Sequence, residues 1–227
     1  MGIGAGRNRA AAKVLTKYLL LTDDDSIFTA ETDLWAMVGL LDRTDASLVG
    51  GYSNPLEFAG DLEFGYREGK AVLLHYHGVC SYPHRQVPGF PGCYNCQITD
   101  NFFLARAQHV LQVGGWSREL KVKEHKDFFV RMKAAQNKVV FCPKLYIKND
   151  HKRSKKYNFE LDEKYYLSLR YDTSRLDRMW RLFNNHWNID TTYDVGLNYV
   201  TLILGIVGIL LVAGIGSYLL ILRIKRK

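Results

Sequence analysis

Short apolar runs alternate with amphipathic stretches over most of the chain before residue 150. The runs have the length and composition of buried strands, and they cover residues 18–22, 47–51, 101–105 and 138–142. Between them lie stretches with helical spacing or composition, at residues 9–17, 29–41, 108–113 and 125–136. This alternation predicts an α/β layered domain, in which ligands bind at the carboxyl ends of the strands.

A hairpin and a loop complete the predicted domain, and a helical segment follows it. Residues 62–82 predict a β-hairpin that turns near residues 68–70, and residues 88–96 form a loop rich in glycine and proline. The strand beginning at Lys138 is expected to end at Pro143. The charged and aromatic residues after Asp150 predict helices, so residues 1–160 form the domain and residues 161–194 a helical connector.

The C-terminal pattern is of a different kind. None of the 28 residues from Val195 to Leu222 is charged, which is long enough for a transmembrane helix. A buried core helix is the alternative. Residues 223–227 form a strongly basic tail, and the positive-inside rule places such a tail in the cytosol. The sequence therefore predicts a single-pass membrane protein whose catalytic part faces the lumen or the outside.

Composition narrows the function. The 227 residues carry a net charge of +8, which suits nucleic acid, anionic membrane or phosphorylated substrates. Basic and aromatic residues do not alternate as in a nucleic-acid groove, so no nucleic-acid partner is expected. The four cysteines contain a single Cys-x-x-Cys, which is not a zinc ribbon, and disulfides are permitted with their pairing open. His75, His77, Cys80 and His84 are either metal ligands or, as we favour, polar positions of a strand.

Three consecutive aspartates follow the first strand candidate. Side chains alternate along an extended segment, so Asp23 and Asp25 point to the same side and suit a hard divalent cation. A cation at this position bridges a diphosphate and neutralises a leaving group. A solvated helix cap is the alternative interpretation of the aspartates.

A second acidic segment reads Glu124-His125-Lys126-Asp127 at the start of a predicted helix. An acid beside a histidine offers a general base, which a sugar hydroxyl needs when it attacks an anomeric carbon. Helix capping is the alternative.

Further polar residues are candidates for ligand contacts. His151 is a candidate ligand for Mn²⁺, and Lys152, within a basic cluster, is a candidate for phosphate oxygens. Arg7 and Asn8 head the first predicted helix and are candidates for nucleotide or phosphate contacts. Structural or surface roles are the alternatives for each of these residues.

The order of these pieces resembles family 2-type glycosyltransferases of the GT-A fold. The more specific resemblance is to the animal β-1,4-N-acetylgalactosaminyltransferases, which include ganglioside-building enzymes, and it runs from about Gly2 to about Tyr171. The motifs that carry it are residues 4–8, 16–18, 23–25, 28–29, 48–51, 89–93, 101–106, 125 and 128–129.

The resemblance implies a partial GT-A domain, a Rossmann-like nucleotide-diphospho-sugar transferase, that lacks its first strands. It implies an inverting transfer of a hexosamine, GalNAc from UDP-GalNAc, with Mn²⁺ or Mg²⁺, to a glycan or glycolipid acceptor. Asp127 is the first choice of base, with Glu124 and His125 as rivals. Many inverting GT-A enzymes have an acid at the position of His125, and this departure from the family pattern leaves the choice among the three open. The residues expected to bind donor and metal are Arg7, Asn8, Asp23, Asp24, Asp25, His151 and Lys152.

The resemblance also implies a lumenal catalytic domain in the Golgi, with the loop at residues 89–96 and Trp116 lining sugars. Two alternatives stay open. One is a catalytically inactive, membrane-anchored binding or scaffold protein, and the other is a processive synthase with a cytosolic catalytic face, against which the basic tail argues. The acceptor is undetermined, and a homodimer is one of the possible oligomeric states.

Overall fold

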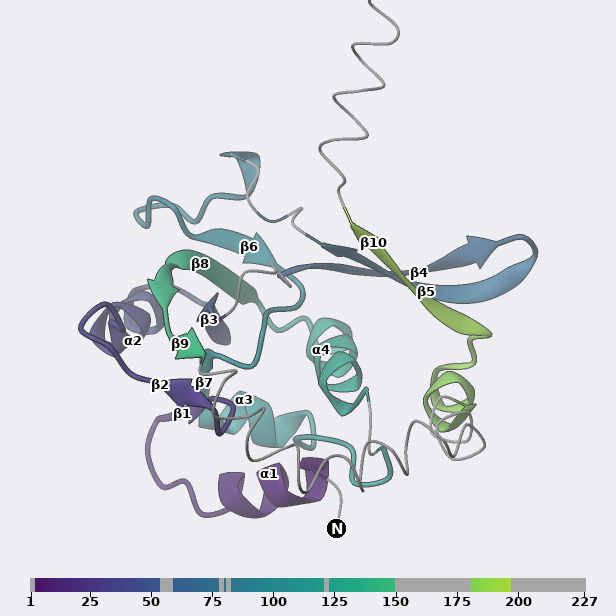
Figure 1. Cartoon of the computed structure of the whole chain (residues 1–227), viewed down its shortest axis with the longest axis horizontal. Helices are drawn as coiled ribbons and strands as arrows, with labels where there is room; N and C mark the ends of the chain where they lie inside the picture. Colours follow the sequence, from purple (N-terminus) through teal and green to yellow (C-terminus); the bar gives the residue numbers. More distant parts are fainter. Residues whose placement is uncertain are drawn as a thin grey trace, which may run out of the picture. The chain divides into compact units, whose positions relative to one another are not determined.

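The computed structural model describes residues 3–53, 59–77, 80, 83–120, 123–149 and 181–196. All of these except Gly196 belong to one compact unit, Met1–Val195. Its centre is a five-stranded sheet in the order β1-β7-β3-β8-β6 (Figure 1). The strands are β1 (Tyr18–Leu21), β3 (Leu48–Tyr52), β6 (Tyr94–Cys96), β7 (Phe103–Arg106) and β8 (Val139–Tyr146).

The central sheet is mixed. β3 and β8 are parallel, whereas β7 runs antiparallel to β1 and β3 on either side of it, and β6 runs antiparallel to β8. β1, β3 and β8 therefore share one direction, and their carboxyl ends meet at one edge of the sheet. The predicted α/β class is confirmed as a mixed α/β arrangement.

Two smaller sheets flank the central one. The hairpin of β4 (Gly60–Arg67) and β5 (Lys70–His77) turns at Glu68 and Gly69, as predicted, and is joined by β10 (Thr191–Gly196) next to β5. β2 (Ser26–Ile27) pairs with β9 (Lys148–Asn149) in a two-stranded sheet, with Ser26 opposite Asn149.

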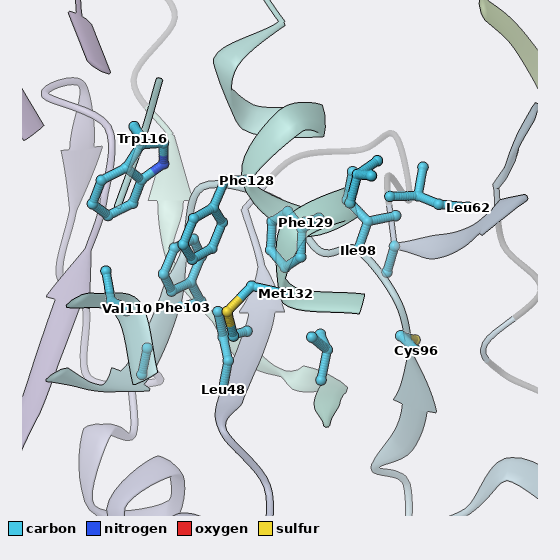
Figure 2. Close-up of a cluster of buried hydrophobic side chains, with 14 of the residues drawn as sticks. Leu48, Leu62, Cys96, Ile98, Phe103, Val110, Trp116, Phe128, Phe129 and Met132 are labelled. Atoms are coloured by element: carbon cyan, nitrogen blue, oxygen red, sulfur yellow. The ribbon is translucent and has the colours of Figure 1, made fainter. Parts of the chain in front are cut away.

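Helices cover both faces of the central sheet, because its strand residues alternate between two cores. Leu48, Phe103 and Val139 belong to the cluster that contains Phe128 and Met132 of α4 (Glu124–Ala134), together with Val110 of α3 (Ala107–Gln112) (Figure 2). The neighbouring strand residues Val49, Leu104 and Val140 face Met37, Leu40 and Leu41 of α2 (Leu34–Arg43). Further helical segments among the described residues are α1 (Ile3–Ala11), the short 3-10 helix η2 (Pro83–Arg85) and residues 181–187.

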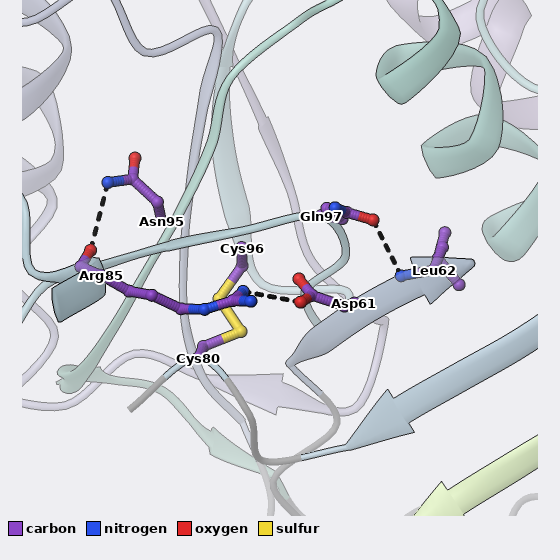
Figure 3. Close-up of a disulfide and its surroundings, with 7 residues drawn as sticks. All are labelled: Asp61, Leu62, Cys80, Arg85, Asn95, Cys96 and Gln97. Carbon is purple, nitrogen blue, oxygen red and sulfur yellow. Dashed lines mark hydrogen bonds and ion pairs between the residues drawn. A yellow bond between two sulfur atoms is a disulfide. The ribbon is translucent and has the colours of Figure 1, made fainter. Parts of the chain in front are cut away.

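Two disulfides settle the pairing that the sequence left open. Cys80 bonds to Cys96, and Cys93 bonds to Cys142 of β8. Around the first disulfide, Arg85 pairs with Asp61 at 2.7 Å, and Gln97 Oε1 accepts a hydrogen bond from the Leu62 amide at 3.0 Å (Figure 3). These contacts join the base of the hairpin to β6. The strand interpretation of the histidine-rich stretch is confirmed for His75 and His77, which lie in β5. The predicted strand, residues 71–82, was too long, because β5 ends at His77, Cys80 bonds to Cys96 and His84 lies in η2.

Several predicted boundaries were wrong for identifiable reasons. α1 begins at Ile3, where Gly4 packs so closely on Ser117 that a Cβ would overlap its carbonyl oxygen. α2 begins after Asp33, whose carboxylate caps the Ala36 amide at 2.9 Å. β8 continues through Pro143, because the β3–β8 ladder is irregular where that proline lies.

The predicted connector is helical only in part of its described residues. Residues 181–187 are helical, but residues 191–196 form β10 because they extend the hairpin sheet. The predicted span at residues 195–222 lies, apart from its first two residues, outside the described residues. In the described part of the chain, no helix has the length and apolar character needed to cross a bilayer.

Candidate active site

The acidic turn lies at the carboxyl edge of the central sheet. Asp23 follows β1 by two positions, and both of its carboxylate oxygens accept from Asn101 Nδ2, at 3.0 and 3.3 Å. Arg7 Nη2 lies 3.7 Å from the same carboxylate, which is 40% exposed. Partial burial raises the pKa of Asp23 to about 6, an effect that Asn101 and Arg7 oppose and that neighbouring Asp25 reinforces. The turn therefore holds an incompletely neutralised group of acids.

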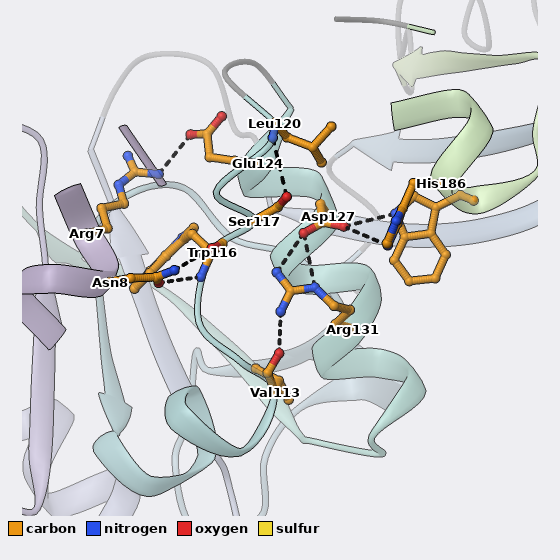
Figure 4. A network of polar contacts seen from close by, with 11 residues as sticks. Arg7, Asn8, Val113, Trp116, Ser117, Leu120, Glu124, Asp127, Arg131 and His186 are labelled. Carbon is orange, nitrogen blue, oxygen red and sulfur yellow. Dashed lines mark hydrogen bonds and ion pairs between the residues drawn. The ribbon is translucent and has the colours of Figure 1, made fainter. Parts of the chain in front are cut away.

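Arg7 joins this turn to the start of α4. Its Nη1 donates to Glu124 Oε1 at 2.9 Å, and both side chains are 10% exposed. Burial raises the pKa of Glu124, whereas the Arg7 guanidinium lowers it. Figure 4 shows Glu124 on the side of α4 that faces Arg7. The structure thus brings together Arg7, Asp23 and Glu124, three predicted site residues from separate parts of the sequence.

Asn8 and Trp116 have structural contacts. Asn8 Nδ2 donates to the Trp116 carbonyl at 2.6 Å, and Asn8 Oδ1 accepts from the Trp116 amide at 2.7 Å (Figure 4). Trp116 is 1% exposed and stacks on Phe128 with ring centroids 4.9 Å apart. The prediction that Trp116 stacks on a sugar is therefore wrong, because its ring is buried in the core. Gly115 has φ +63°, and a Cβ there would overlap Asn8.

Asp127 lies in a separate, buried network. Its Oδ2 accepts from Arg131 Nε at 3.0 Å and Nη2 at 2.6 Å, and its Oδ1 accepts from Trp187 Nε1 at 3.1 Å. His186 Nε2 is 3.8 Å from Oδ1 (Figure 4). The Asp127 side chain is 1% exposed. Both oxygens of the residue that the sequence ranked first as base are therefore occupied by protein donors.

His125 attaches α4 to the loop before β7. Its Nε2 lies 2.7 Å from the carbonyl oxygen of Thr99, so the neutral ring donates its proton there. Burial lowers the pKa of His125 to about 4. The ring is accordingly uncharged at neutral pH and holds the loop that carries Asp100 and Asn101.

Several buried oxygens near the acidic turn have no hydrogen-bond donor among the described residues. They are Asp25 Oδ1, Asn101 Oδ1 and Asn149 Oδ1. Asn149 belongs to β9, which pairs with the strand that follows Asp25. Such oxygens are the ligands that hard divalent cations prefer. Within the described residues, no group of three His, Cys, Asp or Glu side chains is arranged to hold a metal ion.

Two predicted site residues, His151 and Lys152, lie outside the described residues, and Asp24 is exposed. Conversely, the sequence assigned no role to Asp100, Asn101 or Asn149. Asn101 belongs to one of the motifs of the family resemblance, and the available signal was an amide side chain two positions before β7.

A cavity of about 670 Å³ lies at the opposite edge of the sheet. Its lining includes Thr44, which precedes β3, Lys138, which precedes β8, and Gln97. None of the acids described above lines it, so it is not part of this site.

No protein-family profile matches the chain. Individual curated proteins are similar to it in sequence. Rat β-1,4 N-acetylgalactosaminyltransferase 1 is 39% identical over 136 residues, and the human protein of that name is 40% identical over 132 residues. Over this region the chain is similar to β-1,4 N-acetylgalactosaminyltransferases. Mouse β-1,4 N-acetylgalactosaminyltransferase 2 is 33% identical over 126 residues. These matches cover 56% of the chain but only 24% of each relative, so the chain spans about a quarter of the length of the curated relatives it matches. The resemblance indicated by the motifs is confirmed.

Proposed function

We propose that the chain carries the site of an inverting glycosyltransferase, which moves GalNAc from UDP-GalNAc to a glycan or glycolipid acceptor on a GT-A type fold. The observation that carries the proposal is the Asp23–Arg7–Glu124 arrangement at the carboxyl edge of the sheet. Acids at this edge suit a diphosphate donor, and the names of the relatives indicate the sugar.

We propose Asp23, Asp25 and His151 as the ligands of Mn²⁺ or Mg²⁺. The buried, unpartnered Oδ1 of Asp25 supports this assignment, as does the position of Asp23, whose pKa is raised mainly by burial and further by the neighbouring acids Asp100 and Asp25. The pairing of β9 with β2 keeps Asn149 beside the acidic turn. His151 comes two positions after Asn149 in the sequence. A bound cation would neutralise the charge that develops on the departing diphosphate.

Glu124 is the base that the contacts favour. In a single displacement, the acceptor hydroxyl oxygen bonds to the anomeric carbon as the carbon–oxygen bond to the diphosphate breaks. The hydroxyl proton passes to the base, and the electron pair leaves with UDP. Glu124 has a raised pKa, which suits a general base, and Arg7 orients its carboxylate. Asp127 is the weaker candidate, because both of its oxygens already accept hydrogen bonds.

We infer that the remaining predicted contacts belong to the donor and to the compartment. Asp24 and Lys152 would contact the nucleotide diphosphate, and Asn8 would act indirectly by fixing α1 beside it. The two disulfides favour an oxidising compartment, which supports a lumenal Golgi domain anchored by the part of the predicted span that follows β10, residues 197–222.

The test is turnover of UDP-GalNAc by the full chain with Mn²⁺, alongside calorimetry with UDP and Mn²⁺. We expect Asp25→Asn to lose Mn²⁺-dependent UDP binding and Glu124→Gln to keep binding but lose turnover. Asp45→Asn, a surface acid of the opposite edge, is the matched control and should behave as wild type. UDP binding without turnover by the wild-type chain would instead support the inactive binding or scaffold protein.

A further inference from the structure

The first turn of α4 has contacts on two sides. On one side Arg7 pairs with Glu124. On the other lies a segment that we call the clasp, residues 183–192, which follows in sequence more than fifty residues later. Trp187 Nε1 donates to Asp127 at 3.1 Å, and Lys123 Nζ bonds to Thr192 Oγ1 and lies 5.6 Å from the centre of the Phe183 ring. The clasp thus contacts the residue before Glu124 and the residue one turn after it.

The clasp has its own attachment to the hairpin. Asp190 and Ala71 of β5 are joined by two hydrogen bonds, each of 2.7 Å, from the amide of each residue to an oxygen of the other. Phe183 is fully buried in the core, and the Trp187 ring lies 5.9 Å from that of Phe64 of β4. The contacts of Asp190 and Trp187 with the hairpin therefore hold the clasp independently of α4, and the clasp can serve as a fixed reference for the helix.

The start of α4 lacks the usual helix cap. Lys123 occupies the N-cap position with φ +64° and makes no side-chain cap. A lysine in the left-handed region is strained, and strain of this kind persists only where surrounding contacts hold it. At this position a Ser, Thr or Asp side chain would accept hydrogen bonds from the helix amides. The Lys123 side chain instead extends to the clasp.

We propose that the clasp is a positioning element of the active site. By holding Lys123 and Asp127, it fixes the first turn of α4 and thereby the Glu124 carboxylate beside Arg7. This inference rests on the proposed function in taking Glu124 as the base. It makes Asp127 and Trp187 positioning residues, which act through Glu124. Small displacements of a base lower turnover strongly, because proton transfer requires hydrogen-bonding distance.

Trp187→Phe in the full chain tests the proposal, because it removes the donor to Asp127 and keeps an aromatic ring against Phe64. We expect kcat for UDP-GalNAc to fall about tenfold, the size of one hydrogen bond to a charged group, with KM changed less than about twofold. Hydrogen exchange at the amides of Asp127 and Phe128 should quicken. Asn184→Ala, which removes the bond from Asn184 to the Asp190 carbonyl inside the clasp and none to α4, is the control for loss of stability.

A double variant separates positioning from a general loss of structure. In a Glu124→Gln background, Trp187→Phe should lower the residual turnover little further, since the group being positioned is gone. A full tenfold loss in that background, or wild-type kcat and wild-type exchange in Trp187→Phe alone, overturns the proposal. If the wild-type chain has no turnover, the proposed function fails. Hydrogen exchange at the first turn of α4 in Trp187→Phe then tests the role of the clasp by itself. Exchange rates equal to those of the wild type would reject that role.

Discussion

Arg7 lies between two carboxylates, Asp23 and Glu124, the second of them 117 residues away in sequence. Its guanidinium lowers the pKa of both acids, against the burial that raises them. A buried charge that loses its partner costs far more than the pair contributes net. At the residue scale, Arg7 therefore governs the charge state of the proposed site.

Arg7→Met should destabilise the fold by about 3 kcal/mol, because it leaves Glu124 buried without its cation. Urea unfolding at pH 7 measures this change. Lys17→Met, which breaks the exposed pair of Lys17 with Asp42, is the control and should not measurably change the free energy of unfolding. Equal effects of the two substitutions would contradict the prediction.

His125 should make the stability depend on pH in a defined direction. Its pKa is about 4 in the folded chain and about 6.5 when unfolded. Above pH 6.5 both states carry a neutral ring, whereas between pH 6.5 and 4 only the unfolded state takes up the proton. Stability is therefore lost as pH falls through this window, by up to about 3 kcal/mol.

The check is the free energy of unfolding of wild type and His125→Gln at several pH values. Glutamine can donate to the Thr99 carbonyl and does not titrate. The difference between the two proteins should shrink on acidification from pH 6.5 to 4. Parallel curves would show that His125 is not the titrating group, because Asp23 and Glu124 contribute equally to both proteins.

At the scale of elements, β3 depends on glycine for its close packing. A Cβ on Gly51 would overlap the Leu145 carbonyl and the Phe102 ring, and one on Gly50 would overlap Thr99. The strand therefore approaches its surroundings more closely than any side chain permits. Thr99 is the residue that accepts from His125, so this packing also holds the loop of the proposed site.

Gly51→Ala should cost about 2 kcal/mol, since the overlaps force backbone shifts. Gly6→Ala is the matched control. Gly6 is helical, and a Cβ there meets nothing within 4 Å, so this change should stabilise the chain by about 0.5 kcal/mol. Thermal unfolding of both variants compares them directly, and a Gly51→Ala protein as stable as Gly6→Ala would contradict the packing argument.

At the scale of the whole molecule, the disulfides carry part of the stability. Their sequence separations are 16 and 49 residues. Chain-entropy arguments give about 3 and 4 kcal/mol for loops of these lengths. Cys93→Ser/Cys142→Ser should therefore lower the urea midpoint more than Cys80→Ser/Cys96→Ser does, and reductant should lower the midpoint of the wild type but not of a variant without cysteines. The reverse order would reject the loop-length explanation.

Local patterns predicted what is local in this fold. Continuous apolar runs located β1, β3 and β7, because these strands are buried in the central sheet, and helical spacing located α2, because that helix buries one face. The acidic turn was found because it directly follows a strand. The burial of Trp116, the network around Asp127, the disulfide pairing and β10 were not found. Each depends on contacts between residues distant in sequence, which periodicity does not encode.

The reversed direction of β7 decides which of its flanks reaches the acids. At the carboxyl edge of the sheet, β1 and β3 are continued by the residues that follow them in sequence. Because β7 is antiparallel to both, the residues at this edge are those that precede β7. Asp100 and Asn101 lie beside Asp23 for this reason. In chains of this topology, a search for ligand-binding side chains should therefore also include the upstream flank of the inverted strand.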